Sequence, residues 1–209
     1  MPSSFRQIID QAVADHRILI VPGAHDALSA RLIQRIGFET YFIGGFPVAG
    51  ARYGLPDIGL NGFGEISAAV RDIMAACDLP VFVDGDDGYG DVKNVVHTVQ
   101  AYERMGVSAI LLEDQQWPKR CGHMVGKKVV PTELAEAKIK AACSERINPE
   151  TWILARTDAR AVYDSTRRCA GRSVTSAPEP TVSSSKRRAA WRSSSASGAR
   201  STCRRSAIR

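Results

Sequence analysis

The chain has 209 residues, of which 44% are hydrophobic and 7% aromatic, and its formal net charge is +6. This length can bury a sizeable core, and the composition is typical of a globular protein with one or two domains. No apolar run approaches the roughly 20 residues that a membrane helix needs, which excludes a membrane-spanning protein.

The positive charge is confined to one part of the sequence. Ser165–Arg209 contains 11 lysine and arginine residues and one acidic residue, whereas residues 1–164 contain 17 basic and 21 acidic residues. Residues 1–164 are therefore mildly acidic, as in an ordinary metabolic enzyme. We expect them to form a partial catalytic domain, and we expect residues 165–209 to form a basic, disordered tail rich in Ser and Arg.

The cysteines and the N-terminal residues indicate the cellular compartment of the protein. Five cysteines are scattered without the spacing of a disulfide framework: Cys77, Cys121, Cys143, Cys169 and Cys203. The N-terminal residues lack a basic region followed by an apolar one, so the sequence predicts no secretory signal. Both features predict a cytoplasmic protein with reduced thiols.

Short apolar runs alternate with amphipathic patterns along the first 158 residues. Runs rich in Val, Ile, Leu and Phe predict strands at residues 18–21, 40–43, 79–83, 109–112 and 152–155. Apolar residues at helical spacing predict helices at residues 4–16, 25–36, 63–76, 91–105 and 132–146. A long loop rich in Gly and Pro follows the second strand. Leu28, Leu32, Ile33 and Ile36 fall on one face of the second helix.

The strands lack polar alternation, which is typical of a parallel sheet buried on both faces. Alternating strands and helices predict either a doubly wound sheet or a (β/α)8 barrel. Polar and glycine residues gather directly after the strands, at Gly44, Gly45, Asp84, Asp86, Glu113 and Arg156. A barrel carries its chemistry at that face, so we expect the site there.

Carboxylates dominate this end of the predicted sheet. Asp84 and Asp86 are two residues apart, so their side chains can face one site, and Glu113 ends the neighbouring strand. Clustered carboxylates repel one another unless a cation neutralises them, and hard oxygen ligands suit Mg²⁺ or Mn²⁺. The alternative is a solvated acidic loop or a set of helix caps.

Cys121 lies between basic residues, with Lys119, Arg120 and His123 close by in sequence. Positive charge near a thiol favours the thiolate and makes it a better proton donor or base. The alternative is an inert loop thiol, and one Cys and one His are two ligands short of a structural zinc site. Arg156 either binds a carboxylate or forms a structural ion pair with Asp158.

At these residues the chain closely resembles the isocitrate lyase/phosphoenolpyruvate mutase superfamily, nearest to its methylisocitrate lyase, dimethylmalate lyase and carboxyphosphonoenolpyruvate mutase branch. The resemblance covers about residues 18–164. It rests on Lys119-Arg-Cys-Gly-His123, Val83-Asp-Gly-Asp-Asp-Gly-Tyr-Gly90, Leu112-Glu-Asp-Gln115, Pro22–Arg31 and Gly54–Leu60. It implies a (β/α)8 barrel of the phosphoenolpyruvate mutase type, incomplete here at about five β/α units, and a homo-oligomer.

The resemblance also implies a chemistry. Mg²⁺ would be held by Asp84 and Asp86, with Asp57 and Glu113 in support through water, and Mn²⁺ could replace it. The substrate would be a small di- or tricarboxylic acid such as methylisocitrate or dimethylmalate, cleaved to pyruvate or a related 2-oxo acid. In the lyase signature, which includes Lys119 and His123, Cys121 would protonate the enolate. Arg156 would hold a carboxylate, and Gly44 and Gly45 would offer backbone N–H groups.

Three departures from the family pattern bear on the substrate. Phe42-Ile43-Gly44-Gly45 stands where Tyr-Leu-Ser-Gly is common, and Phe46-Pro47 replaces small residues. The metal loop has Asp-Gly-Asp-Asp where Asp-Ala-Asp-Thr is usual. A mutase that forms P–C bonds is the alternative enzyme, because the carboxyphosphonoenolpyruvate mutase branch also resembles the chain closely. A nucleic-acid binder that uses the basic tail is not favoured, because Trp191 is the tail's only aromatic residue.

The tail itself has a further interpretation. With suitable synonymous codons, Ser165–Arg209 can be translated in the adjacent frame as helix, strand, helix and strand, starting on the last base of the Asp164 codon. We therefore hypothesise a single-base loss near codon 164, which resequencing would test. If the tail is the true product, the barrel stays open, and we expect a chain that folds poorly and has little lyase activity.

Overall fold

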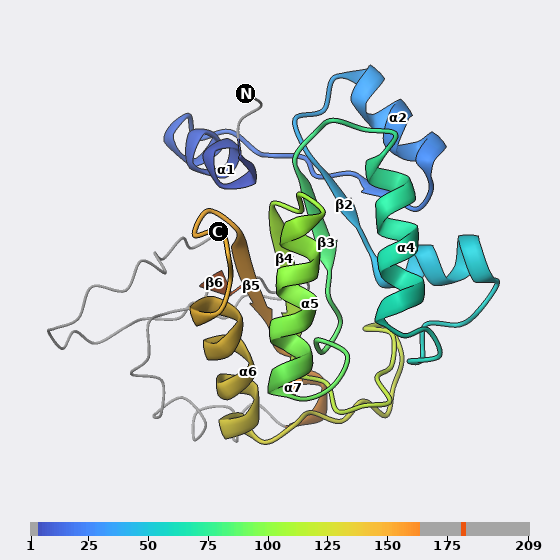
Figure 1. The fold of residues 1–209 in the computed structure, drawn as a ribbon, viewed down its shortest axis with the longest axis vertical. Helices are drawn as coiled ribbons and strands as arrows, with labels where there is room; N and C mark the ends of the chain where they lie inside the picture. Colours follow the sequence, from blue (N-terminus) through green and yellow to red (C-terminus); the bar gives the residue numbers. More distant parts are fainter. Residues whose placement is uncertain (1–3, 164–180, 183–209) are drawn as a thin grey trace, which may run out of the picture.

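The computed structural model describes residues 4–163 and 181–182 and contains one parallel sheet (Figure 1). Its strands lie in sequence order: β1 (Gly23–Ala24), β2 (Tyr41–Ile43), β3 (Val81–Asp84), β4 (Ala109–Glu113), β5 (Trp152–Arg156) and β6 (Thr181–Val182). Each strand pairs in parallel with the next. The predicted α/β class with a parallel sheet is confirmed, and β1–β5 with the helices that follow them form five β/α units.

The predicted long helices are present: α1 (Phe5–Ala14), α2 (Ala27–Ile36), α4 (Phe63–Met74), α5 (Val92–Arg104) and α6 (Thr132–Ser144). Side chains fix where several of them begin, because Ser4, Asp26 and Asp91 accept hydrogen bonds from the first turns of α1, α2 and α5. Gly37 ends α2 with φ of 97°, a conformation that favours glycine.

Short helical elements occur that the sequence analysis did not predict. After β2 the chain forms α3 (Gly45–Val48) and a π-helical turn (Ala49–Tyr53), and after β5 it forms α7 (Ala159–Val162). Glycine and proline in the first segment hid this helical character from the sequence analysis. The segment matters because it brings Gly45 beside the polar site.

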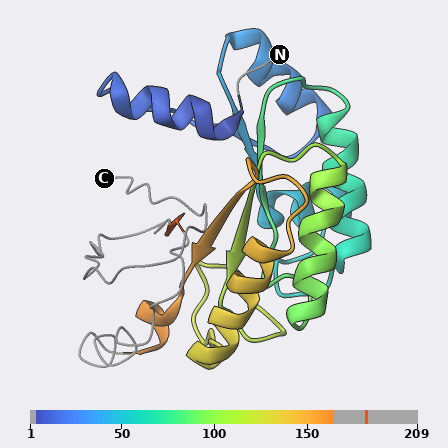
Figure 2. The ribbon, with the colours of Figure 1, turned by 60° about the vertical axis from the view of Figure 1, so that its left-hand side comes forward.

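The sheet has two differently covered faces. Helices α4, α5 and α6 lie together along one face, and α1 lies on the other (Figure 2). Val83, Ile110 and Ile153 belong to the larger core with the helices, whereas Leu111 and Trp152 pack with Phe5 of α1. Side chains alternate along a strand, so the last residues of β3, β4 and β5 share the face of the smaller core. These three residues are Asp84, Glu113 and Arg156.

Two expectations for the N-terminal region are wrong. The first strand is Gly23–Ala24 and not residues 18–21, where Ile18 is 89% exposed. On α2, Leu28 is 67% exposed and Ile36 is 71% exposed, and Ile33 is the only one of the four predicted apolar-face residues that is buried. The physical reason is the same for both, because β1 is the edge strand of the described sheet and pairs there with β2 alone.

The predicted tail is represented by β6 alone. Thr181 and Val182 pair with Leu154 and Ala155 of β5. The predicted disorder of residues 165–209 and the hypothesis of a base loss at codon 164 otherwise lie outside the described residues. Within the described part of the chain, no helix combines the length and the apolar character needed to cross a membrane.

Candidate active site

The site lies at the carboxyl ends of three neighbouring strands. Asp84 ends β3 beside Leu111, and Glu113 ends β4 beside Arg156 of β5. The turn after β3 adds Asp86. Two loops that are distant in sequence add Asp57 and Lys119 to the same place.

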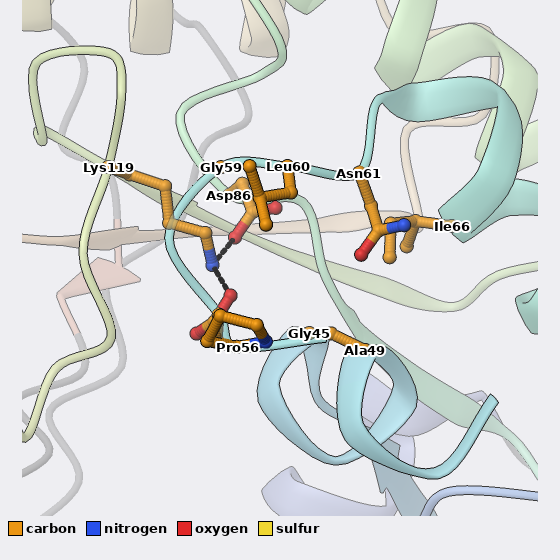
Figure 3. Close-up of a pocket in the computed structure, with 10 residues that line it drawn as sticks. Gly45, Ala49, Pro56, Gly59, Leu60, Asn61, Ile66, Asp86 and Lys119 are labelled. Carbon is orange, nitrogen blue, oxygen red and sulfur yellow. Dashed lines mark hydrogen bonds and ion pairs between the residues drawn. The ribbon is translucent and has the colours of Figure 1, made fainter. Parts of the chain in front are cut away.

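An ammonium group occupies the centre of the acidic cluster. Lys119 Nζ forms ion pairs with Oδ1 of Asp57 and, at 2.6 Å, with Oδ1 of Asp86 (Figure 3). Lys119 and Asp86 are each 4% exposed. The pair is thus removed from water, and Lys119 provides one positive charge beside these two carboxyl groups.

A small, shallow pocket borders this ion pair. Figure 3 shows Lys119 and Asp86 on one side, with Asn61 and Ile66 on the other. The remaining lining residues are Gly45, Ala49, Pro56, Asp57, Gly59 and Leu60.

Gly45 lies directly against the carboxylates. A Cβ atom placed on it would lie 3.5 Å from Asp86 Oδ1, 3.6 Å from Lys119 Nζ and 3.7 Å from Asp84 Oδ2. Its N–H donates to Asp84 Oδ2 at 3.4 Å, and the N–H of Asp86 donates to Asp84 Oδ1 at 3.0 Å. The Gly45 N–H that the resemblance assigned to a substrate therefore contacts Asp84 in this structure. Gly44 precedes it at the start of α3.

Burial and neighbouring negative charge raise the pKa of two acids of the site, Asp86 and Glu113. Burial raises the pKa of Asp86 to about 7, and the negative charge of Asp84 acts in the same direction against the opposing effect of Lys119. Burial and Asp84 also raise the pKa of Glu113 well above its usual value. For Lys119, burial opposes the charged form, but the carboxylates outweigh it and raise its pKa. The lysine thus stays charged, whereas burial and like charge favour the protonated forms of Asp86 and Glu113.

Arg156 is engaged with two acids. Its NH1 lies 3.1 Å from Glu113 Oε2 and its NH2 lies 2.9 Å from Asp158 Oδ2. The sequence analysis grouped Glu113 with Asp84 and Asp86 and left open whether Arg156 pairs with Asp158. In the structure the ion pair with Asp158 is present, and Glu113 contacts Arg156 as well.

The loop that carries Cys121 is anchored to the cluster through its backbone. The N–H of Cys121 donates to the carbonyl of Asp57 at 2.9 Å, and Cys121 Sγ lies 3.6 Å from His123 Nδ1. The side chain of Gln115 holds the preceding residue, because it bonds both the N–H and the carbonyl of Arg120 at 2.9 Å. The sequence analysis assigned no role to Gln115, and its place after β4 was the available signal.

The donors fit a hard divalent cation, although no three His, Cys, Asp or Glu side chains of the described residues form a ready ligand set. Asp57, Asp84 and Asp86 offer carboxylate oxygens, the atoms that Mg²⁺ prefers. Glu113 Oε1 is buried and accepts no hydrogen bond. The Lys119 ammonium already stands in for a cation at this position. A metal ion would have to take its place.

The fold and the site together define a class: a β/α-repeat protein with an acidic small-molecule site at the carboxyl ends of its strands. Within that class, the chain belongs to the phosphoenolpyruvate phosphomutase family, which its sequence matches over residues 10–194. The resemblance to the isocitrate lyase/phosphoenolpyruvate mutase superfamily is thereby confirmed.

Curated relatives include two named lyases. The chain is 43% identical over 150 residues to 2,3-dimethylmalate lyase of Eubacterium barkeri, covering 72% of this chain and 52% of the relative. It is 40% identical over 163 residues to 2-methylisocitrate lyase of Halalkalibacterium halodurans, covering 77% and 53%. The chain thus spans about half the length of these relatives.

Solved structures agree with the fold. A crystal structure of a 2,3-dimethylmalate lyase superposes with a TM-score of 0.72 at 32% identity, covering 81% of this chain and 57% of that one. A phosphonopyruvate hydrolase solved with oxalate and Mg²⁺ gives a TM-score of 0.71 at 27% identity, covering 88% and 64%.

Proposed function

We propose that this site serves a Mg²⁺-dependent carbon–carbon lyase. Its substrate would be a 2-methylisocitrate- or dimethylmalate-like acid, and its product pyruvate or a related 2-oxo acid. The single observation that carries the proposal is the group of Asp57, Asp84 and the buried Asp86 around one ammonium, next to a small pocket. An organic anion meets net negative charge there, so its binding requires an added cation.

The metal would be held by Asp84 and Asp86, with Asp57 and Glu113 in support through water, and Mn²⁺ has the same ligand preferences. When bound, Mg²⁺ supplies the positive charge that stabilises the enolate of the 2-oxo acid. The lysine ammonium that now neutralises Asp57 and Asp86 would be free to contact the substrate.

The other groups hold the substrate and move a proton. Arg156 uses two of its five N–H groups on Glu113 and Asp158, and the remaining donors can bind a substrate carboxylate. Cys121 Sγ holds the proton that passes to the enolate carbon, and His123 Nδ1, at 3.6 Å, can replenish it. We also infer from the family resemblance that the protein is a homo-oligomer, which light scattering would test.

The first test measures binding, because the sequence predicts little turnover by the 209-residue chain. Oxalate resembles the enolate of pyruvate, and we expect isothermal titration to detect its binding with Mg²⁺ and not with EDTA. An Asp86→Asn variant should bind no oxalate under either condition. Oxalate binding that is equally tight in EDTA would contradict the proposal.

A phosphonate-forming mutase is the second candidate, because the family that the chain matches is that of phosphoenolpyruvate phosphomutase. Single-turnover reactions at high protein concentration separate the two. We expect pyruvate from 2-methylisocitrate or 2,3-dimethylmalate, and none from these acids with Cys121→Ser. Conversion of phosphoenolpyruvate to phosphonopyruvate, seen by ³¹P NMR, would favour the mutase instead.

A further inference from the structure

We propose that Lys138 is a positioning residue for the site. Its buried ion pair with Asp87 holds the loop after β3 in the conformation that directs Asp86 to the acidic cluster, beside Asp84 at the end of the strand. The proposal deepens the proposed function and rests on it for the role of these two carboxylates. Neither Lys138 nor Asp87 lines the pocket, so both act through the loop and not on a substrate.

Two non-glycine residues of the loop have a backbone conformation that such residues rarely adopt. Asp86 and Tyr89 adopt left-handed φ values of 49° and 60°, and Gly88 and Gly90 have φ of 85° and 146°. Asp87 is the one residue of this run without a positive φ. Non-glycine residues leave the left-handed region unless neighbouring groups fix them there. Some contact from outside the run must therefore hold it.

Lys138 supplies such a contact from α6, 51 residues along the chain. Its Nζ donates to the carbonyl oxygen of Asp87 at 2.9 Å and lies 3.1 Å from Asp87 Oδ2. The other carboxylate oxygen, Oδ1, accepts the N–H of Tyr89 at 2.9 Å. Lys138 is 5% exposed and Asp87 is 2% exposed. One lysine thus fixes the main chain and, through a shared carboxylate, the strained residue that follows.

The opposite side of the loop is held by β4. The N–H of Gly85 donates to the Leu111 carbonyl and the N–H of Glu113 donates to the Asp86 carbonyl, both at 2.8 Å. A Cβ on Gly85 would lie 2.9 Å from the Leu111 oxygen, which is too close. Gly85 and Asp87 are the two departures from the usual Asp-Ala-Asp-Thr loop. The structure explains both departures by the contacts of the loop. Gly85 lies against β4, and Asp87 forms the ion pair with Lys138 of α6.

Four variants test the pair: Lys138→Met, Asp87→Thr, the double variant and Lys138→Arg. Each single loss leaves a buried charge unpaired, so both single variants should be less stable to heat. The double variant removes both charges and should regain most of that stability. Lys140→Met, at an exposed position of the same helix, is the matched control and should behave as wild type.

Amide hydrogen exchange gives the deciding measurement and needs no metal. In the double variant we expect peptides spanning residues 84–91 to exchange at least tenfold faster than in wild type, with no change for α4 at residues 63–74. Lys138→Arg should restore slow exchange. A folded double variant whose loop exchanges at the wild-type rate would overturn the proposal. If the double variant does not fold, unaltered exchange of the loop in folded Asp87→Thr would do the same.

Metal affinity then connects the loop to the site. We expect the double variant to bind Mn²⁺ about tenfold more weakly than wild type and Lys138→Arg to bind within about threefold. Fast loop exchange with unchanged Mn²⁺ affinity would show a structural pair only and would overturn the positioning role. If wild type binds no Mn²⁺, the proposed function fails, whereas the exchange data still test the contact itself.

Discussion

The two halves of the site differ in how their charges balance. In the first, which we call the Lys119 half, one ammonium lies among Asp57, Asp84 and Asp86. In the second, the Arg156 half, Arg156 contacts Glu113 and Asp158, and Lys127 Nζ adds a second positive charge 3.8 Å from Asp158. Acids exceed bases by three to one in the first half and are equal in number to them in the second.

This difference assigns the two halves different ligands. Burial and the negative charge of Asp84 raise the pKa of Asp86, and the proposed function places a divalent cation in the Lys119 half. The Arg156 half already has its counter-charges and retains guanidinium donors for a carboxylate. Under the proposed function the site binds both a metal ion and an organic anion, which would require both kinds of surface side by side.

The largest effect should come from removing one carboxylate of the Lys119 half. Asp86→Asn deletes a charge at the centre of the cluster while keeping the shape of the side chain. We expect Mn²⁺ affinity to fall at least ~1,000-fold, or about 4 kcal/mol. Titration calorimetry would measure it, with Asp72→Asn, at an exposed partner of Arg52, as the control. Affinity within tenfold of wild type would remove Asp86 from the metal site.

The same half should make stability depend on pH. The pKa of Asp86 is about 7 in the folded protein and 3.8 as its ordinary value, so the folded state binds more protons between these values. Its contribution is complete below pH 3.8 and is lost as pH rises through 7. Without metal, unfolding free energy should fall by about 2–3 kcal/mol from pH 5 to pH 8.

Urea unfolding in EDTA at several pH values would measure this slope. Glu113, whose pKa is also raised, acts in the same direction, so Asp86→Asn should reduce the slope without abolishing it. Stability that rises over this range, or a slope that Asp86→Asn leaves unchanged, would contradict the charge imbalance inferred for the Lys119 half.

The sequence predicted which residues form most of the Lys119 half, but it did not predict how their side chains contact one another. Asp84 and Asp86 follow a strand two residues apart, which brings them to one site by strand alternation alone. That the ammonium of Lys119 reaches between Asp57 and Asp86 depends on two loops whose paths carry no periodic pattern. Glu113 pairs with Arg156 because β4 and β5 are in register at these residues, and register is not visible in a single strand.

In the fold, too, local features were predicted from the sequence and long-range contacts were not. Helix caps such as Asp91 and apolar runs such as residues 109–112 act locally, so the predicted long helices and every predicted strand except the first are present. The apolar face of α2 was misjudged because burial depends on neighbours, and Leu28 and Ile36 have none that cover them in the described residues. The Asp87–Lys138 pair joins residues 51 positions apart, a separation at which helical or strand spacing predicts nothing.

Replacing the basic residue of each half with methionine should change the binding of different ligands. Lys119→Met removes the ammonium that competes with a metal ion, so Mn²⁺ should bind about tenfold more tightly, or ~1.4 kcal/mol. Arg156→Met should change Mn²⁺ affinity by less than about threefold and should weaken oxalate binding instead. Calorimetric titration of each variant would measure both ligands. Weaker Mn²⁺ binding by Lys119→Met would mean that the lysine supports the metal site and does not compete for it.

The smallest effects should come from one methyl group added to each half. A Cβ on Gly45 would meet three polar atoms of the Lys119 half at 3.5–3.7 Å, which is ordinary contact, so Gly45→Ala should change stability by less than ~0.5 kcal/mol. A Cβ on Gly122 would lie 2.6 Å from the guanidinium of Arg156, which two ion pairs hold in place. Gly122→Ala should therefore cost about 1 kcal/mol in urea unfolding. A larger loss of stability for Gly45→Ala than for Gly122→Ala would mean that the Lys119 half is the more tightly packed of the two. It would then have no room for an added cation.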